Sequence, residues 1–234
     1  MLARGVRVIA TSREPSKLES LGIEAIRVED VPGVIEPGCL VLHSIPPEGS
    51  PNIVELLSDA PARVVYLSTT GVYGSAKVVD EMTPVDWSNE RARVRLEEER
   101  RIQAGSWSSL VLRPAAIYGP GRGVQESVRQ GTYPSGDNFI SRIHVDDLAA
   151  HAEAALLSDV TGAYPVADEE PCTSREIAEF CANLLHVKLP DGPVAAPRIF
   201  GDRKVDGSAI RKLLGVTLRY PSYRAGIPAA ILET

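Results

Sequence analysis

The sequence of 234 residues has few cysteines, no long apolar run and no excess of positive charge. Its three cysteines, Cys39, Cys172 and Cys181, lie far apart, so neither a disulfide framework nor a Cys-x-x-Cys zinc site is expected. Histidines and carboxylates do not cluster at metal-ligand spacing either, so we expect no metal site.

Membrane and nucleic-acid partners are also not expected. No apolar run approaches the length of a membrane-spanning helix, and the first residues lack the apolar core of a signal peptide. The net charge of −6 argues against nonspecific binding to nucleic acid or anionic membranes. The reducing cytoplasm is the expected location, and the length suits one α/β domain, alone or with a small lobe.

Short apolar strands alternate with helices along the chain, which predicts a parallel sheet covered on both faces. The expected strands are 6–10, 24–28, 39–43, 63–68, 107–112, 139–143 and 163–167. The expected helices are 15–20, 51–58, 88–103, 147–157, 173–186 and 207–214, with a short one after 123 and the tail of another at 2–4. Ser88, Asp146 and Thr173 are the expected N-caps, and Glu176 completes a capping box with Thr173.

The stretch from Val64 to Gly74 begins as a buried strand and breaks into hydroxyls and glycine. Ligands of parallel α/β sheets bind just beyond the carboxyl ends of the strands. Ser68, Thr69 and Thr70 are therefore expected to face a ligand crevice, the alternative being an ordinary strand-to-loop exit.

Three segments together resemble the extended short-chain dehydrogenase/reductases, the NAD-dependent epimerase/dehydratase family. They are Leu67-Ser-Thr-Thr-Gly-Val-Tyr-Gly74, Leu112-Arg-Pro114 with Ile117-Tyr-Gly-Pro-Gly-Arg122, and Arg142-Ile-His-Val-Asp-Asp-Leu-Ala149. The resemblance implies a Rossmann-type, doubly wound parallel sheet with a small C-terminal substrate lobe. It divides the chain into a nucleotide-binding part, 1–120, and a part completing the sheet and forming the lobe, 121–234. It also implies NAD or NADP as cofactor, a sugar nucleotide or similar small molecule as substrate, and a homodimer.

The resemblance implies roles for particular residues. On the cofactor side these are Arg13, Ser44, Ile45, Pro46, Ser68, Thr70, Pro114 and Ile117. Arg13 favours NADP through forked hydrogen bonds to a 2′-phosphate, although it suits a surface arginine too. Ser44-Ile45-Pro46 equally fits a plain proline-rich turn.

On the substrate side, Thr69 matches the catalytic Ser/Thr of the family, acting either in catalysis or only in positioning a ligand. Tyr73 and Tyr118 are candidate substitute proton donors. Arg122 and Arg142 are candidates to hold a substrate phosphate, with surface salt bridges as the alternative. His144 is a candidate base, but in this motif we expect it to join the strand to the capped helix.

Two features of the family are missing. No Gly-x-Gly-x-x-Gly turn precedes Val6, and Gly119-x-Gly121-x-Gly123 has the wrong spacing. The chain is therefore expected to begin inside the first helix, from a misplaced gene start or as a truncated relative, which would leave two strand edges unpaired. The helix after Ser88 also has no Tyr-x-x-x-Lys; the best-fitting register places Asn89 and Arg93 at those positions.

Three hypotheses follow. The protein is an NAD(P)-dependent oxidoreductase or epimerase with a non-standard proton donor, or a non-catalytic dinucleotide-binding or sensing relative, or an incomplete chain that binds little by itself.

Overall fold

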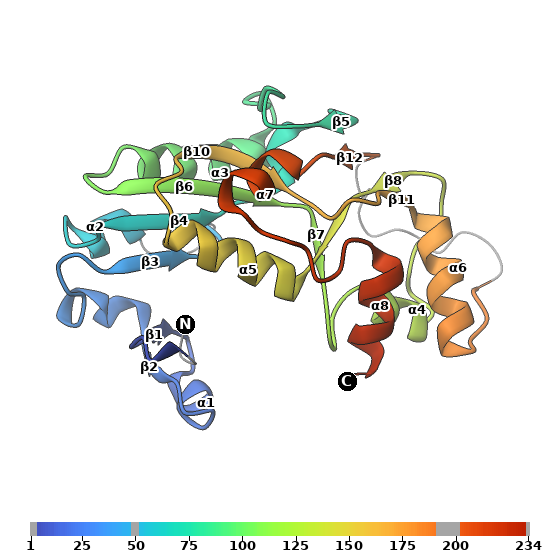
Figure 1. The fold of residues 1–234 in the computed structure, drawn as a ribbon, viewed down its shortest axis with the longest axis horizontal. Coiled ribbons are helices and arrows are strands. Elements are labelled where there is room, and N and C mark those ends of the chain that lie inside the picture. Colours follow the sequence, from blue (N-terminus) through green and yellow to red (C-terminus); the bar gives the residue numbers. More distant parts are fainter. Residues whose placement is uncertain (1–3, 48–51, 191–201, 233–234) are drawn as a thin grey trace.

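The centre of the protein is a parallel sheet of four strands in the order β10-β6-β4-β3 (Figure 1). The computed structural model describes residues 4–47, 52–190 and 202–232. The four strands are β3 (Leu40–His43), β4 (Arg63–Leu67), β6 (Ser108–Pro114) and β10 (Gly162–Val166). Because every pair is parallel, the carboxyl ends of all four strands lie at one edge, where ligands bind in this class of sheet.

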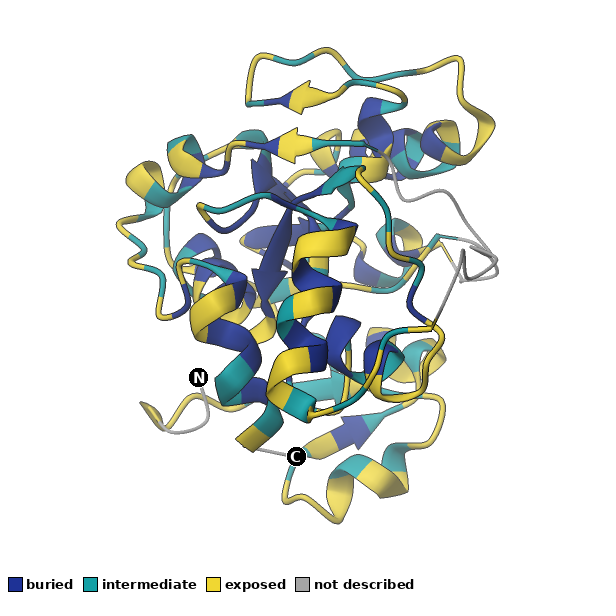
Figure 2. Ribbon diagram, turned by 90° about the vertical axis from the view of Figure 1, so that its right-hand side faces the viewer, coloured by how far each residue is buried: buried dark blue, intermediate teal, exposed yellow. Residues whose placement is uncertain are grey.

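Helices cover both faces of this sheet, which confirms the predicted doubly wound α/β class. Val65, Leu110 and Leu112 pack against α5 (Val145–Leu156) and α7 (Ser208–Leu214) on one face. Val64, Tyr66 and Val111 pack against α2 (Ile53–Leu57) and α3 (Glu90–Gln103) on the other. Successive side chains of a strand point to opposite faces, so these short apolar runs supply both cores. Figure 2 shows the resulting buried sheet inside a shell of half-exposed helices.

The first part of the chain forms a separate two-stranded sheet. In it, β1 (Ile9–Thr11) pairs in parallel with β2 (Glu24–Ile26), and the short helix α1 (Pro15–Glu19) and the 3-10 turn η2 (Val28–Gly33) flank the pair. Among the described residues β1 pairs only with β2 and β3 only with β4, so each of these two strands has one unpaired edge. Two apolar side chains of the edge strand β3 are also exposed to solvent: Leu40 is 41% exposed and Leu42 is 43% exposed.

A second lobe lies beyond the carboxyl ends of the sheet (Figure 1). Its helices are α4 (Val124–Arg129), α6 (Ser174–Leu185) and α8 (Tyr223–Leu232), packed around Tyr118, Tyr133 and Ile177. Three short pairings connect it to the sheet: β7 (Ala116–Tyr118) with β9 (Arg142–His144), β8 (Phe139–Ile140) with β11 (Cys172–Thr173), and β5 (Val78–Val79) with β12 (Lys204–Val205). The division at residue 120 stays a prediction.

Two predicted helix caps are wrong. The side chain of Asn89, not of Ser88, caps α3 by accepting hydrogen bonds from the backbone N–H of Arg91 and of Ala92. The Ser88 hydroxyl donates to Asp86 instead. At α5 the cap is His144, whose Nδ1 accepts from the Asp146 backbone N–H, so His144 has the structural role expected of it and Asp146 lies in the first turn. The capping box of Thr173 and Glu176 is confirmed.

Several boundaries also differ from the predictions. The 6–10 strand is shorter and lies at Ile9–Thr11, and the 107–112 strand continues to Pro114. Strand β5 and helix α8 fall in segments expected to be loop or loose tail. The expected helix tail at 2–4 and the expected helix start at Pro51 involve residues outside the described part of the chain.

Candidate functional site

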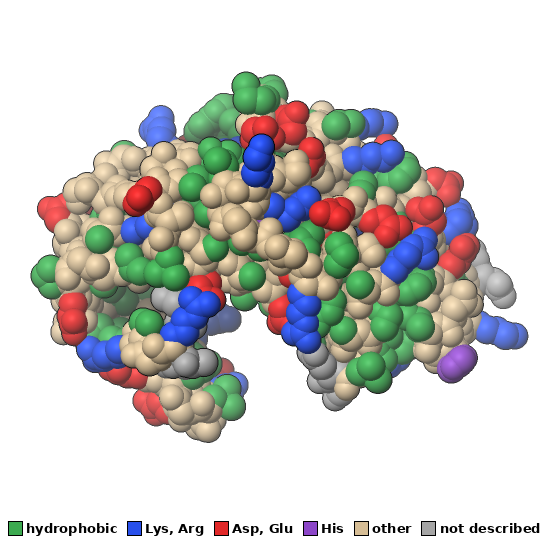
Figure 3. Space-filling view, in the orientation of Figure 1, with side chains coloured by type: hydrophobic (Ala, Val, Ile, Leu, Met, Phe, Trp, Pro, Cys, Tyr) green, Lys and Arg blue, Asp and Glu red, His purple; other side chains and the backbone are tan. Residues whose placement is uncertain are grey.

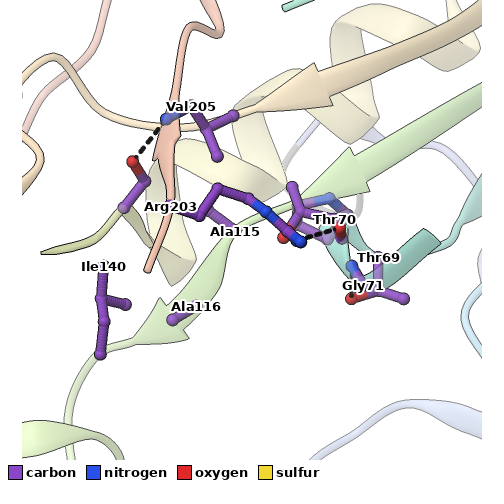
Figure 4. Close-up of a pocket in the computed structure, with 10 residues that line it drawn as sticks. Thr69, Thr70, Gly71, Ala115, Ala116, Ile140, Arg203 and Val205 are labelled. Carbon is purple, nitrogen blue, oxygen red and sulfur yellow. Dashed lines mark hydrogen bonds between the residues drawn. The ribbon is translucent and has the colours of Figure 1, made fainter. Parts of the chain in front are cut away.

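A cavity of about 290 Å³ lies where β4 and β6 end. Strand β4 leads through Thr69 into the 3-10 turn η3 (Thr70–Tyr73), and β6 ends at Pro114. This first cavity is lined by Thr69, Thr70, Gly71, Pro114, Ala115, Ala116, Ile140, Ser141, Arg203 and Val205 (Figure 4). The structure therefore brings Thr69, Thr70 and Pro114 together in one hollow, as the sequence predicts.

Thr69 is held in place by its own turn. Its Oγ1 accepts a hydrogen bond of 3.1 Å from the backbone N–H of Gly71, and the side chain caps η3. A hydroxyl that accepts one hydrogen bond still has its proton to donate. Thr69 is half-buried and lines the cavity, so it can present this donor to an oxygen of a ligand.

Arg203 forms the opposite wall of the first cavity and was not singled out from the sequence. Its guanidinium donates to the carbonyls of Thr70, Gly74 and Ala76, and so joins the chain beside β12 to the turn that follows Thr69 (Figure 4). Burial lowers its pKa, although a guanidinium stays charged in proteins. Arg203 forms no ion pair with a described carboxylate, and three backbone carbonyls hold its guanidinium in the wall of the cavity. No sequence signal pointed to Arg203, because a lone arginine in a proline-rich segment matches no motif.

Ser68 and Tyr73 belong to a buried network beside the first cavity and do not line it. The Ser68 hydroxyl donates to Glu99 over 2.5 Å, and Glu99 forms a 2.6 Å ion pair with Arg113. Arg113 in turn donates to the Tyr73 hydroxyl. Burial raises the pKa of Tyr73, which makes this phenol a poorer acid near neutrality.

A second cavity, of about 410 Å³, adjoins the first and shares Ala116 and Ile140 with it. The substrate-side candidates Tyr118, Arg122 and Arg142 line it, as does Ile117 from the cofactor-side set. Its other lining residues are Gly123, Val124, Ser127, Thr132, Tyr133 and Pro134. Burial raises the pKa of Tyr118.

Arg142 is fixed within the wall of this second cavity. It is only 5% exposed, and its guanidinium donates to the Ile140 carbonyl, the Cys172 sulfur and the Tyr133 hydroxyl. Tyr133 was not predicted to line the site, because the polar loop around it carries no motif; the available signal was an aromatic residue among polar ones.

The remaining cofactor-side candidates lie on other turns. Arg13 is exposed after β1, while Ser44, Ile45 and Pro46 follow β3. Neither segment lines the two cavities, so their roles stay predictions.

Helix α3 is where the Tyr-Lys pair of the family would lie, but the residues at the two predicted positions do not replace that pair. Asn89 is occupied as the cap of α3, and Arg93 is exposed. The half-buried arginine of this helix is Arg95, which acts on His43 at the end of β3. Burial, and then the Arg95 charge, lower the pKa of His43 to about 4.

Metal and membrane features are absent from the part of the chain that the structure describes. In residues 4–47, 52–190 and 202–232, no three histidine, cysteine or carboxylate side chains are grouped to hold a metal ion. No helix in these ranges has the length and apolar character needed to cross a membrane.

A parallel sheet wound on both faces, with a cavity beyond the carboxyl ends of two adjacent strands, defines a Rossmann-type α/β fold. No protein-family model matches the chain. A solved structure from Silicibacter pomeroyi, a conserved protein of unknown function, is 30% identical, has a TM-score of 0.80, and is matched over 99% of this chain and 92% of its own. A structure from Methylobacillus flagellatus, assigned to the NAD-dependent epimerases/dehydratases, is 23% identical with a TM-score of 0.73 over 96% and 97% of the two chains.

The chain has the fold of the NAD-dependent epimerases/dehydratases, the family that its motifs resemble. Among curated proteins it is similar to the 3-diazoavenalumate denitrifying reductase of a Streptomyces species, 29% identical over 77% of this chain and 69% of the relative. It spans 64% of the length of Escherichia coli YeeZ, to which it is 27% identical. Two structures of the same fold hold cofactors: Bordetella bronchiseptica WbmG holds NAD, and human SDR39U1 holds NADPH.

Proposed function

We propose that the protein is an NAD(P)-dependent oxidoreductase of the epimerase/dehydratase type, acting on a sugar nucleotide or a similar small organic molecule. The observation that carries the proposal is the first cavity, where Thr69 and Pro114 meet beyond two adjacent strands. The similar proteins support it, since one is a reductase and others hold NAD or NADPH.

The residues of the first cavity fit the nicotinamide end of such a cofactor. A bound NAD(P) would supply or accept a hydride, and the backbone from Pro114 to Ile117 would face its amide. Thr69 would donate a hydrogen bond to the reacting oxygen of the substrate, and Arg203 would keep the Thr69 turn in place. The glycine-rich pyrophosphate turn has no counterpart in the sequence, so this fit concerns the nicotinamide end.

The proposal includes several narrower expectations. Exposed Arg13 favours NADP over NAD. The partner is a small-molecule substrate, and neither nucleic acid nor membrane; the protein is a cytoplasmic homodimer. The described cysteines are free thiols, which suits a reducing compartment.

A second candidate function is dinucleotide binding or sensing without turnover. It is favoured by the missing Tyr-Lys pair and by the raised pKa values of Tyr73 and Tyr118, which leave neither phenol suited to proton transfer near neutrality.

One set of measurements separates the two functions. NADPH and NADH are titrated into the protein while nicotinamide fluorescence is followed, and carbonyl and sugar-nucleotide substrates are then screened for turnover. An oxidoreductase binds the cofactor and turns over at least one class, whereas a sensor binds it and turns over none.

Replacing Thr69 by Val tests the role of its hydroxyl. If Thr69 donates to the reacting oxygen, Thr69→Val lowers kcat by about 10²-fold to 10³-fold, the usual effect of losing one such donor, and leaves cofactor affinity unchanged. Thr217→Val, at an exposed position, is the matched control and retains full activity. Equal kcat values for Thr69→Val and the control would contradict the assignment.

A further inference from the structure

The second cavity has walls of an unusual kind for a site that binds polar substrates. Six of its lining residues present carbon surface: Ile117, Tyr118, Val124, Tyr133, Pro134 and Ile140. Its volume of about 410 Å³ lies within the range of roughly 300–1,000 Å³ typical of small-molecule sites.

The polar ends of both tyrosines are directed to partners in the protein. The Tyr118 hydroxyl donates to the Ser222 carbonyl and lies against Gly226 of α8, where even an added Cβ would be 2.1 Å from it. The Tyr133 hydroxyl accepts from Arg142. The surface that these tyrosines offer to the cavity is therefore mainly ring surface.

The other polar lining groups are also engaged. The Ser127 and Thr132 hydroxyls donate to backbone carbonyls of the same lobe. The Arg142 guanidinium donates three hydrogen bonds within the wall. A ligand with many hydroxyl groups would find few free partners here. Buried polar groups left without a partner are costly, which disfavours a sugar ring in this space.

Arg122 is the exception among the lining residues. It is exposed and yet lines the cavity, which places it at the mouth, and it forms no ion pair with any described carboxylate. A guanidinium in this position can form forked hydrogen bonds to a carboxylate.

We propose that the second cavity binds the ring of a small aromatic carboxylic acid, with its carboxylate on Arg122. Flat rings pack well against tyrosine, proline and aliphatic side chains, and the Arg122 guanidinium at the mouth, which no described carboxylate pairs, selects an anionic end. The inference rests on the proposed function in one respect: the first cavity, across Ala116 and Ile140, then receives the reacting part of the same molecule.

The test uses trans-cinnamate as the probe, with binding followed both by calorimetry and by methyl NMR. Cinnamate is expected to shift the methyl signals of Ile117, Val124 and Ile140 through its ring current, whereas acetate does not. Arg122→Gln is expected to weaken cinnamate binding about 10-fold to 100-fold, since a charged hydrogen bond is lost. Arg129→Gln, an exposed arginine in the same lobe, is the matched control and keeps the wild-type affinity.

Two further ligands decide between outcomes. Cinnamyl alcohol, which lacks the carboxylate, should bind wild type and Arg122→Gln equally weakly. UDP-glucose should not shift the three methyl signals; if it does so and cinnamate does not, the proposal is overturned. Equal cinnamate affinity for Arg122→Gln and Arg129→Gln would overturn it as well.

Failure of the proposed function is recorded separately, by titrating NADPH into the same samples. Cinnamate binding without NADPH binding supports the cavity assignment and contradicts the oxidoreductase. NADPH binding without cinnamate binding, in the presence or absence of cofactor, contradicts the cavity assignment alone.

Discussion

Ser68 and Tyr73 show how single residues can match a site motif and serve the core instead. Both lie within the motif that carries Thr69, yet their hydroxyls are bound to the buried ion pair of Glu99 and Arg113. A sequence shows that a hydroxyl follows a strand but not on which side of the turn it points. Alternate residues of an extended segment face opposite sides, so Thr69 and its neighbour Ser68 differ in role.

Removing one partner of this ion pair should be costly, because the other charge is then buried alone. We expect Glu99→Gln to lower the free energy of unfolding by about 3–5 kcal/mol. Glu126→Gln breaks the more exposed ion pair with Arg129 and should cost no more than about 1 kcal/mol. Urea unfolding of both variants measures the difference, and equal losses would show that the network contributes nothing beyond a surface pair.

His43 makes the stability of the protein depend on pH. It is 4% exposed, stacks on Tyr66, and has Glu98 at 3.6 Å and the Arg95 charge nearby. Its pKa falls from 6.5 to about 4 on folding, so between these values the unfolded chain binds a proton that the folded protein does not. The contribution of His43 to the free energy of unfolding is therefore complete above pH 6.5 and is lost as the pH falls toward 4.

Between pH 8 and pH 5, the stability lost through the titration of His43 amounts to about 2 kcal/mol. In His43→Gln the group no longer titrates, so the variant should lose about that much less stability than wild type over the same interval. Denaturation at pH 8 and at pH 5 gives both differences, and any constant effect of the substitution cancels. Parallel losses in the two proteins would contradict the assigned pKa.

At the scale of elements, the central strands and their order along the chain were predictable. Short β-branched runs such as Val64 to Leu67 have few alternatives to a buried strand. Local capping chemistry was predictable where it involves a reciprocal pair, as with Thr173 and Glu176. It was not predictable where neighbouring residues compete, because Ser88 and Asn89 are both good caps and only the path of the chain decides between them.

Two of the elements that the sequence did not reveal, α8 and β5, depend on distant contacts. Helix α8 contains Gly226 and Pro228, both poor helix formers, and is stabilised by burial of Tyr223 and Ile227 in the second lobe. Strand β5 has only two residues and exists because β12, more than a hundred residues later, pairs with it. Propensity is a weak guide where tertiary packing supplies the stability.

On the scale of the whole molecule, the four-stranded sheet, the β1–β2 pair and the second lobe surround a common indentation. Figure 3 shows this face of the molecule hollowed between the β1–β2 unit and the lobe of α4, α6 and α8. The motif order in the sequence predicted that the Thr69 turn and the Pro114 segment meet, because both follow adjacent parallel strands. Arg203 and Tyr133 reach the cavities from segments with no recognisable motif, so their part in the site required the structure.

Ala116 offers the most direct measurement of the central claim, because it is exposed and lines both cavities. Ala116→Trp should fill the space between them without disturbing the core, and Ala149→Trp, at an exposed position of α5, is the matched control. NADPH is titrated into wild type and both variants while nicotinamide fluorescence is followed. We predict that wild type and Ala149→Trp bind NADPH with the same affinity. Ala116→Trp should be as stable as wild type but should bind NADPH at least 10-fold more weakly. Unchanged binding by Ala116→Trp would show that the nicotinamide does not lie beside Thr69 and Pro114.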